Sequence, residues 1–103
     1  MPKTPTGKTK IVSVVADTPI VADSWCSQVT FGESPANAGW PTTDFDVKKP
    51  STTAVARRVP PGATYSEEGS FQPGDIVAYA TATVGATNFF VDEKQGVRPT
   101  GSM

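Results

Sequence analysis

The run IVAYATATV, from Ile76 to Val84, constrains the fold more than any other segment of the chain. Successive side chains of a β-strand point to opposite faces, so residues at even positions share one face and residues at odd positions share the other. The even face is wholly apolar, whereas the odd face carries Val, Tyr and Thr. We expect the even face to be buried against a closely approaching second layer, because three of its members are alanine. Its residues are Ile76, Ala78, Ala80, Ala82 and Val84.

The flanks of this run favour turns over a helix. β-Branched Ile, Val and Thr fill the run, and Pro73-Gly74 stands where a helix would need a cap. The Pro-Gly pair predicts a type II turn. After the run, residues 85–88 predict a hairpin connection into a strand that contains Phe89 and Phe90.

The composition extends this interpretation to the whole chain. Its 103 residues include ten prolines and nine glycines but no leucine, and Thr, Val and Ala dominate. Such a composition is typical of short strands joined by turns. We therefore expect an all-β fold with six to eight strands. It would be an antiparallel β-sandwich of the jelly-roll or Ig-like type, or a small barrel, with extended terminal arms.

A single β domain is expected over residues 11–95, between an extended N-terminal arm, residues 1–10, and a C-terminal tail, residues 96–103. The longest irregular region, residues 32–51, is rich in proline, and within it only Phe45 and Val47 suggest a short edge strand. Further strands are predicted over residues 11–16, 20–22, 25–31 and 52–59, and a single turn over 64–70.

Charge is distributed unevenly along the chain. The arm carries Lys3, Lys8 and Lys10 and no acid, the tail carries Arg98, and the body holds ten acidic against five basic residues. An acidic body is a poor match for nucleic acid, which is bound by a basic face. Basic ends instead suit an acidic protein neighbour, and solvation of a free chain end is the alternative.

The sequence predicts no catalytic residues, no metal site and no cofactor. Histidine, the commonest general base and metal ligand, is absent. The single cysteine, Cys26, has no histidine to activate it and is expected to pack as a small apolar residue. It cannot form an internal disulfide, and neither a signal peptide nor a membrane-spanning stretch is visible.

The aromatic residues are the remaining candidates for a binding site. Trp40 lies in a polar loop, where its indole either anchors an interface or folds back over the core. Trp25 is in phase with Val29 and Phe31 and is expected in the core. The pair Phe89 and Phe90 places one ring on each face of its strand, so Phe90 indicates an interface outside the main core.

The basic arm MPKTPTGKTK, the leucine-free β body and the polar tail RPTGSM together resemble the small decoration or cement proteins of tailed-phage capsids. Such proteins are compact β domains whose extended ends clamp neighbouring shell subunits. The resemblance implies a non-enzymatic structural protein of the virion, made in the host cytoplasm. Its partner would be the major capsid protein or another protein assembly, with a homo-oligomer or lattice as its state and with neither nucleic acid nor membrane as a partner. The partner-binding residues would be Lys3, Lys8, Lys10, Trp40, Phe90 and Arg98.

A carbohydrate-binding or adhesion module is the alternative function. In that case Trp40 and Tyr65 would be stacking platforms, and Asp44 and Asp46 would accept hydrogen bonds from sugar hydroxyls. This alternative requires Trp40 to be exposed beside the two acids.

Overall fold

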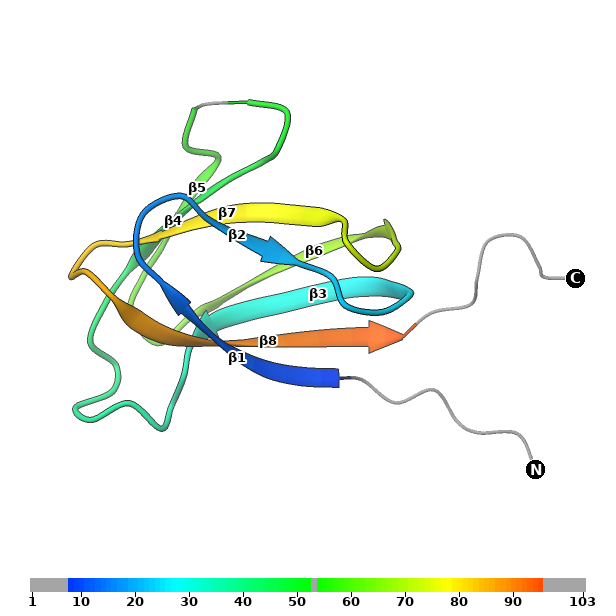
Figure 1. Ribbon diagram of the computed structural model, residues 1–103. Helices are drawn as coiled ribbons and strands as arrows, with labels where there is room; N and C mark the ends of the chain where they lie inside the picture. Colours follow the sequence, from blue (N-terminus) through cyan, green and yellow to red (C-terminus); the bar gives the residue numbers. More distant parts are fainter. Residues whose placement is uncertain (1–7, 53, 96–103) are drawn as a thin grey trace, which may run out of the picture.

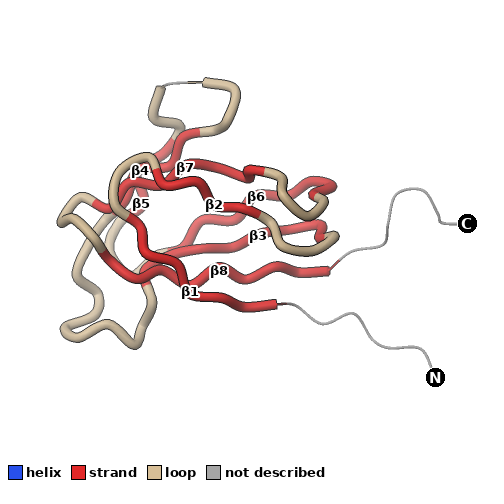
Figure 2. Tube along the Cα trace, in the orientation of Figure 1, coloured by secondary structure: helices blue, strands red, loops and turns tan. Residues whose placement is uncertain are grey.

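The computed structural model describes residues 8–52 and 54–95. These residues form eight strands and no helix (Figures 1 and 2), which confirms the predicted all-β class. The strands are β1 (Lys8–Val14), β2 (Thr18–Val21), β3 (Cys26–Glu33), β4 (Phe45–Lys48), β5 (Arg57–Val59), β6 (Thr64–Phe71), β7 (Ile76–Ala82) and β8 (Thr87–Gln95).

The strands form two four-stranded antiparallel sheets that stack face to face (Figure 1). Sheet A has the order β1-β8-β3-β6, and sheet B has the order β2-β7-β4-β5. Consecutive strands lie in different sheets, with the exception of β4 and β5, so neighbours within a sheet are distant in sequence. This order of eight strands is that of a jelly roll, one of the sandwich types expected from the sequence.

The core lies between the two sheets and is built around three phenylalanine rings. Phe45 of sheet B lies with its ring centroid 6.0 Å from that of Phe31 and 4.9 Å from that of Phe89, both in sheet A. All three side chains are buried, and the ring of Phe89 meets Phe45 edge-on. The two sheets therefore interdigitate through aromatic contacts, a geometry that aromatic pairs prefer.

Small side chains surround these rings. Ala78, Ala80 and Ala82 of β7 are buried, as predicted from the alternation. Within sheet B, Ala82 pairs with Phe45 and Ala80 pairs with Val47. A large side chain on β4 thus stands beside a small one on β7, which leaves room for the rings of the opposite sheet at native packing density.

The two ends of the predicted buried face are exposed, which corrects the prediction for Ile76 and Val84. Val84 is 61% exposed because β7 ends at Ala82 and Val84 lies in the turn that follows. Ile76 is the first residue of β7 and is 40% exposed. It pairs with Val21 across a register shift that follows Ile20. Burial along the run therefore stops where the covering layer ends.

Three local predictions are wrong. The connection over residues 85–88 is not a hairpin, because β7 lies in sheet B and β8 in sheet A. Residues 64–70 do not form a single turn but belong to β6, an eight-residue edge strand. Phe45 and Val47 lie on β4, which is an inner strand between β7 and β5 and not an edge strand.

The strand predicted over residues 52–59 is shorter than expected and is confined to β5. Its place at the edge of sheet B agrees with its adjacent arginines.

The turn before β7 is as predicted. The Asp75 backbone N–H donates to the Gln72 carbonyl at 3.0 Å, and Gly74 has a φ of 95°. A positive φ at this position is what a type II turn requires, and glycine adopts it without steric cost.

Trp25 is only partly buried, which corrects its expected place in the core. It precedes β3, and the pairing of β3 shifts by one residue between Cys26 and Gln28. This irregularity changes the phase of the strand, so that Cys26 joins Val29 and Phe31 on the inner face. The expectation that Cys26 packs as a small apolar residue is confirmed, since it is 4% exposed.

Replacing Ala80 by leucine should lower the free energy of unfolding by about 1–3 kcal/mol, because extra methylene groups strain a well-packed core. Ala80 is fully buried and is flanked on β4 by Val47. Urea unfolding of the variant measures the effect. The control Ala86→Leu adds the same atoms at an exposed turn and should change the stability by no more than about 0.5 kcal/mol. Equal stability of the two variants would contradict the close approach of the sheets.

Candidate interaction surface

The chain enters and leaves the body at one end, on neighbouring strands. β1 begins with Lys8 and pairs antiparallel with β8, where Glu93 lies opposite Lys8. The first residue of β1 and the last residues of β8 are therefore side by side (Figure 1). Lys8 is exposed there, and β1 starts three residues before the strand expected from the sequence. Lys3 and Arg98 lie outside the described residues.

Lys10 is engaged within the body. Its Nζ donates to the Val21 carbonyl and to Asp23 Oδ2, each at 2.8 Å, and lies 4.0 Å from Glu93 Oε2. β1 is an edge strand of sheet A, and Val21 ends β2, an edge strand of sheet B. Lys10 therefore bridges the two sheets at the side where these edges lie. The charge of Lys10 is therefore matched within the body by Asp23 and Glu93.

Glu93 is a buried carboxylate at this same end of the molecule, with only 1% exposure. Oε2 accepts a hydrogen bond from the Asp23 backbone N–H at 2.7 Å, and Oε1 accepts one from Ser24 Oγ at 2.6 Å. A buried charge is tolerated when its oxygen atoms are hydrogen-bonded and a cation is near, here Lys10. Glu93 therefore holds the β2–β3 connection against sheet A.

Phe90 lies on the outer face of sheet A. Phe89 is fully buried and Phe90 is only partly buried, so the pair presents one ring to each face, as the sequence predicted. Across the sheet, Phe90 pairs with Ile11 on one side and Gly32 on the other. Because Ile11 is 57% exposed, these residues form an apolar strip on an otherwise polar sheet face.

Trp40 lies at the opposite end of the sandwich, in the β3–β4 connection. Its side chain remains 41% exposed, and an atom of its ring lies about 4.0 Å from where a Cβ on Gly62 would stand. The indole therefore rests beside the β5–β6 turn and keeps a free portion. The structure does not bring Trp40 together with Lys8, which lies at the other end of sheet A. Phe90 pairs with Gly32, close to the end of β3 that leads into this connection, and stands on the outer face of the sheet.

Glu33 organises the connection that carries Trp40. It is 4% exposed and accepts hydrogen bonds from the Thr42 N–H at 2.8 Å, the Thr43 N–H at 3.1 Å and the Asn37 amide at 3.4 Å, as well as from the Thr42 hydroxyl. Burial raises the pKa of the Glu33 carboxyl. The donors outweigh burial and hold the pKa below its ordinary value of 4.5.

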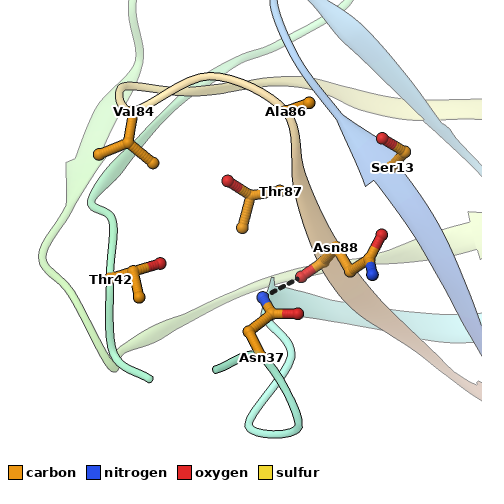
Figure 3. Close-up of a pocket in the computed structure, with 7 residues that line it drawn as sticks. All are labelled: Ser13, Asn37, Thr42, Val84, Ala86, Thr87 and Asn88. Carbon is orange, nitrogen blue, oxygen red and sulfur yellow. Dashed lines mark hydrogen bonds between the residues drawn. The ribbon is translucent and has the colours of Figure 1, made fainter. Parts of the chain in front are cut away.

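A polar hollow of about 370 Å³ opens at this end (Figure 3). Along one side of it, the Asn37 amide donates to the Asn88 carbonyl at 2.9 Å. The hollow can hydrogen-bond to neutral polar groups, and none of its lining side chains is ionisable. These side chains are Ser13, Asn37, Thr42, Val84, Ala86, Thr87 and Asn88.

Asp44 and Asp46 are both paired with one arginine. Arg58 Nη1 lies 3.0 Å from Asp44 Oδ2, and Arg58 Nε donates to Asp46. The Thr83 hydroxyl also donates to Asp44, and this bond, with the charge of Arg58, holds the pKa of Asp44 below its ordinary value. In residues 8–52 and 54–95, no group of three or more acidic or cysteine side chains is placed to hold a metal ion.

Tyr65 is directed into the sandwich. Its ring centroid lies 5.5 Å from that of Phe31, and its hydroxyl donates to Glu67 at 2.6 Å. Burial and this bond raise the pKa of Tyr65 to about 12. Its ring therefore packs against the core rather than standing free on the surface.

No helical segment in the described part of the chain has the length and hydropathy of a membrane span.

Glu33 and Glu93 belong to no recognisable motif, although the sequence carries a signal for each. Glu33 shares the phase of Val29 and Phe31 on β3, and Glu93 shares the phase of Phe89 and Val91 on β8. An acid in phase with buried apolar residues indicates a carboxylate that folding must satisfy with hydrogen bonds.

Replacing Glu33 by glutamine should destabilise the protein by about 1–3 kcal/mol at neutral pH, because an amide nitrogen then faces backbone N–H donors. A carboxyl group whose pKa is lowered on folding stabilises the protein above its unfolded-state pKa, and this contribution disappears as the pH falls through the folded-state pKa. The difference in unfolding free energy between the natural protein and the variant should therefore shrink in acid. Exposed Glu68→Gln is the control. A difference that is independent of pH would contradict this role of Glu33.

No protein-family model matches the chain, and neither a curated protein nor a solved structure shows significant similarity to it. A function for this protein has therefore to be inferred from its fold and its surfaces.

Proposed function

We propose that this protein is a non-enzymatic structural protein of a virion, a decoration subunit that binds and stabilises a capsid shell. The β body rests on the shell, and the terminal segments contact neighbouring subunits of the major capsid protein. The protein acts at the particle surface and binds neither nucleic acid nor membrane.

The observation that carries the proposal is the common exit of both terminal segments. β1 and β8 are adjacent, and Lys8 at the start of β1 lies opposite Glu93 near the end of β8. Two segments that leave a body side by side can reach the same or adjacent partner subunits. Both segments carry basic residues, Lys3 in the first and Arg98 in the second. An acidic partner surface would attract both.

The jelly roll supports the proposal by analogy. This architecture occurs in viral capsid domains and also in lectin domains, so the fold alone does not select between the two candidate functions. The placement of the residues needed by each function is more informative.

The carbohydrate alternative loses support on this ground. It requires Asp44 and Asp46 to be free for sugar hydroxyls, yet both are paired with Arg58. It also assigns a stacking role to Tyr65, whose ring packs on Phe31 inside the sandwich. Only the partial exposure of Trp40 is in its favour. An exposed tryptophan anchors protein interfaces as well as it stacks on sugars.

Binding through the terminal segments must overcome an entropic cost of roughly 1–2 kcal/mol for each residue that becomes ordered. Exposed ion pairs of lysine contribute only about 0–1 kcal/mol each. We therefore infer that backbone pairing with a strand of the partner supplies the remainder, as in other complexes where an extended segment adds to a sheet.

Deleting residues 2–7 should leave the body folded with a nearly unchanged thermal midpoint, because β1 begins at Lys8. The same deletion should abolish binding to the shell. The measurement is co-expression with the major capsid protein of the source genome, gradient purification of the particles, and quantification of the bound protein.

Deletion of residues 96–103 should weaken binding in the same assay. The control is Ala86→Leu, which changes neither the N-terminal nor the C-terminal segment of the chain. If the protein that lacks residues 2–7 still occupies the particles fully, the terminal segment is not a clamp. If the intact protein never co-purifies with particles, the decoration function itself is wrong.

A further inference from the structure

The edges of the two sheets are protected to different degrees. In sheet B, β2 has four residues, includes Pro19 and has an irregular register, and β5 has three residues and exposes Arg57 and Arg58. Short strands, proline and charge are the devices that prevent pairing at a sheet edge. Sheet A ends in longer strands, β1 with seven residues and β6 with eight. Association along a sheet would therefore involve sheet A.

The two edges of sheet A carry opposite charges in the same row of residues. Lys8 of β1 pairs with Glu93 of β8, Glu93 pairs with Val29 of β3, and Val29 pairs with Glu67 of β6. A lysine thus begins the row and a glutamate ends it. The next row runs from Thr9 at one edge to Ser66 at the other, so a hydroxyl group stands at each of its ends.

The directions of the strands allow a second copy to continue the sheet. β1 is antiparallel to β8, β8 to β3, and β3 to β6, so β6 runs opposite to β1. If β6 of a second copy is placed beside β1, the alternation of directions is preserved. The added pair is antiparallel, which is the more stable arrangement per residue.

We propose that copies of this chain associate head to tail, with β1 of one copy paired to β6 of the next and Lys8 opposite Glu67 of that next copy. In this register Thr9 faces Ser66 of the next copy, so charge and hydroxyl pairs occupy adjacent rows. Opposite charges directly across two strands stabilise the pairing, and like charges oppose it.

The two charged groups are available for this contact. Lys8 is exposed and forms no ion pair with another residue among those described. Glu67 accepts from Tyr65 and lies 3.1 Å from Lys49 Nζ, but a carboxylate has acceptor positions for further donors. Burial raises the pKa of Glu67, whereas the hydrogen bonds from Tyr65 and Lys49 lower it below its ordinary value, so the group is charged at neutral pH.

Such an interface joins two different surfaces, so each copy offers the β1 edge to one neighbour and the β6 edge to another. Heterologous contacts of this kind close into a ring or extend as a helical filament, according to the rotation between copies. The twist of the sheet supplies a rotation at each added strand. The inference goes beyond the proposed function because it needs no capsid, and its failure would leave the decoration function intact.

Sedimentation velocity of the full chain tests the proposal. The natural protein should form larger species as its concentration rises. The variants Lys8→Glu and Glu67→Lys each place like charges opposite one another, and each alone should associate about tenfold more weakly. An equimolar mixture of the two variants should recover the natural behaviour, because every interface in an alternating assembly then pairs a lysine with a glutamate.

Controls separate this outcome from misfolding and from other interfaces. The thermal midpoint of each variant shows whether the body is folded, and recovery in the mixture requires that it is. Lys49→Gln removes one of the two internal partners of Glu67 and leaves Tyr65 in place, and Arg57→Glu alters an edge of sheet B, so both variants should associate like the natural protein. A natural protein that stays monomeric at all concentrations, or a mixture without recovery, would overturn the proposal. Normal association of Glu67→Lys alone would also overturn it.

Discussion

The contact of Phe45 with Phe31 and Phe89 sets the spacing between the two sheets. Each fully buried phenylalanine contributes about 1.5–3 kcal/mol relative to an exposed one, and aromatic pairs add about 0.5–1.5 kcal/mol. In a chain without leucine, these rings are the largest fully buried side chains of the core. Alanine on the neighbouring strand β7 accommodates them, so the sequence of β7 depends on the aromatic residues of other strands.

The features that could be predicted from the sequence are those that depend on a single strand. The alternation in β7 and in Phe89-Phe90 predicted which central side chains are buried. β6 could not be recognised in the same way, because its sequence TYSEEGSF is mostly polar. An edge strand at the rim of a sandwich buries little on either face, so selection for alternating apolar residues is weak there. The order of the strands depends on pairings between distant residues, for which local patterns carry no signal.

The placement of charged residues could be predicted even less. The position of Lys10 in a basic segment predicts partner binding, but the fold brings Asp23 and the Val21 carbonyl to its ammonium group. Val21 belongs to the other sheet, and Asp23 lies in the connection between β2 and β3. Glu33 and Glu93 have equivalent roles at opposite ends of sheet A, since each carboxylate satisfies the backbone of an adjoining connection. Which connection lies within reach is decided by the topology and not by spacing along the chain.

The position of β8 between β1 and β3 has a consequence for how the chain folds. Among the strands of residues 8–52 and 54–95, β8 is the last in chain order, yet it provides the only sheet partner of β1 and one of the two partners of β3. During synthesis from the N-terminus, β1 therefore waits without a partner until nearly all of the body has emerged. Pairings that span so much of the chain make folding slow and leave strand edges open meanwhile. In a nascent chain, sheet A is thus completed in a single late step, when β8 enters between strands that are already present.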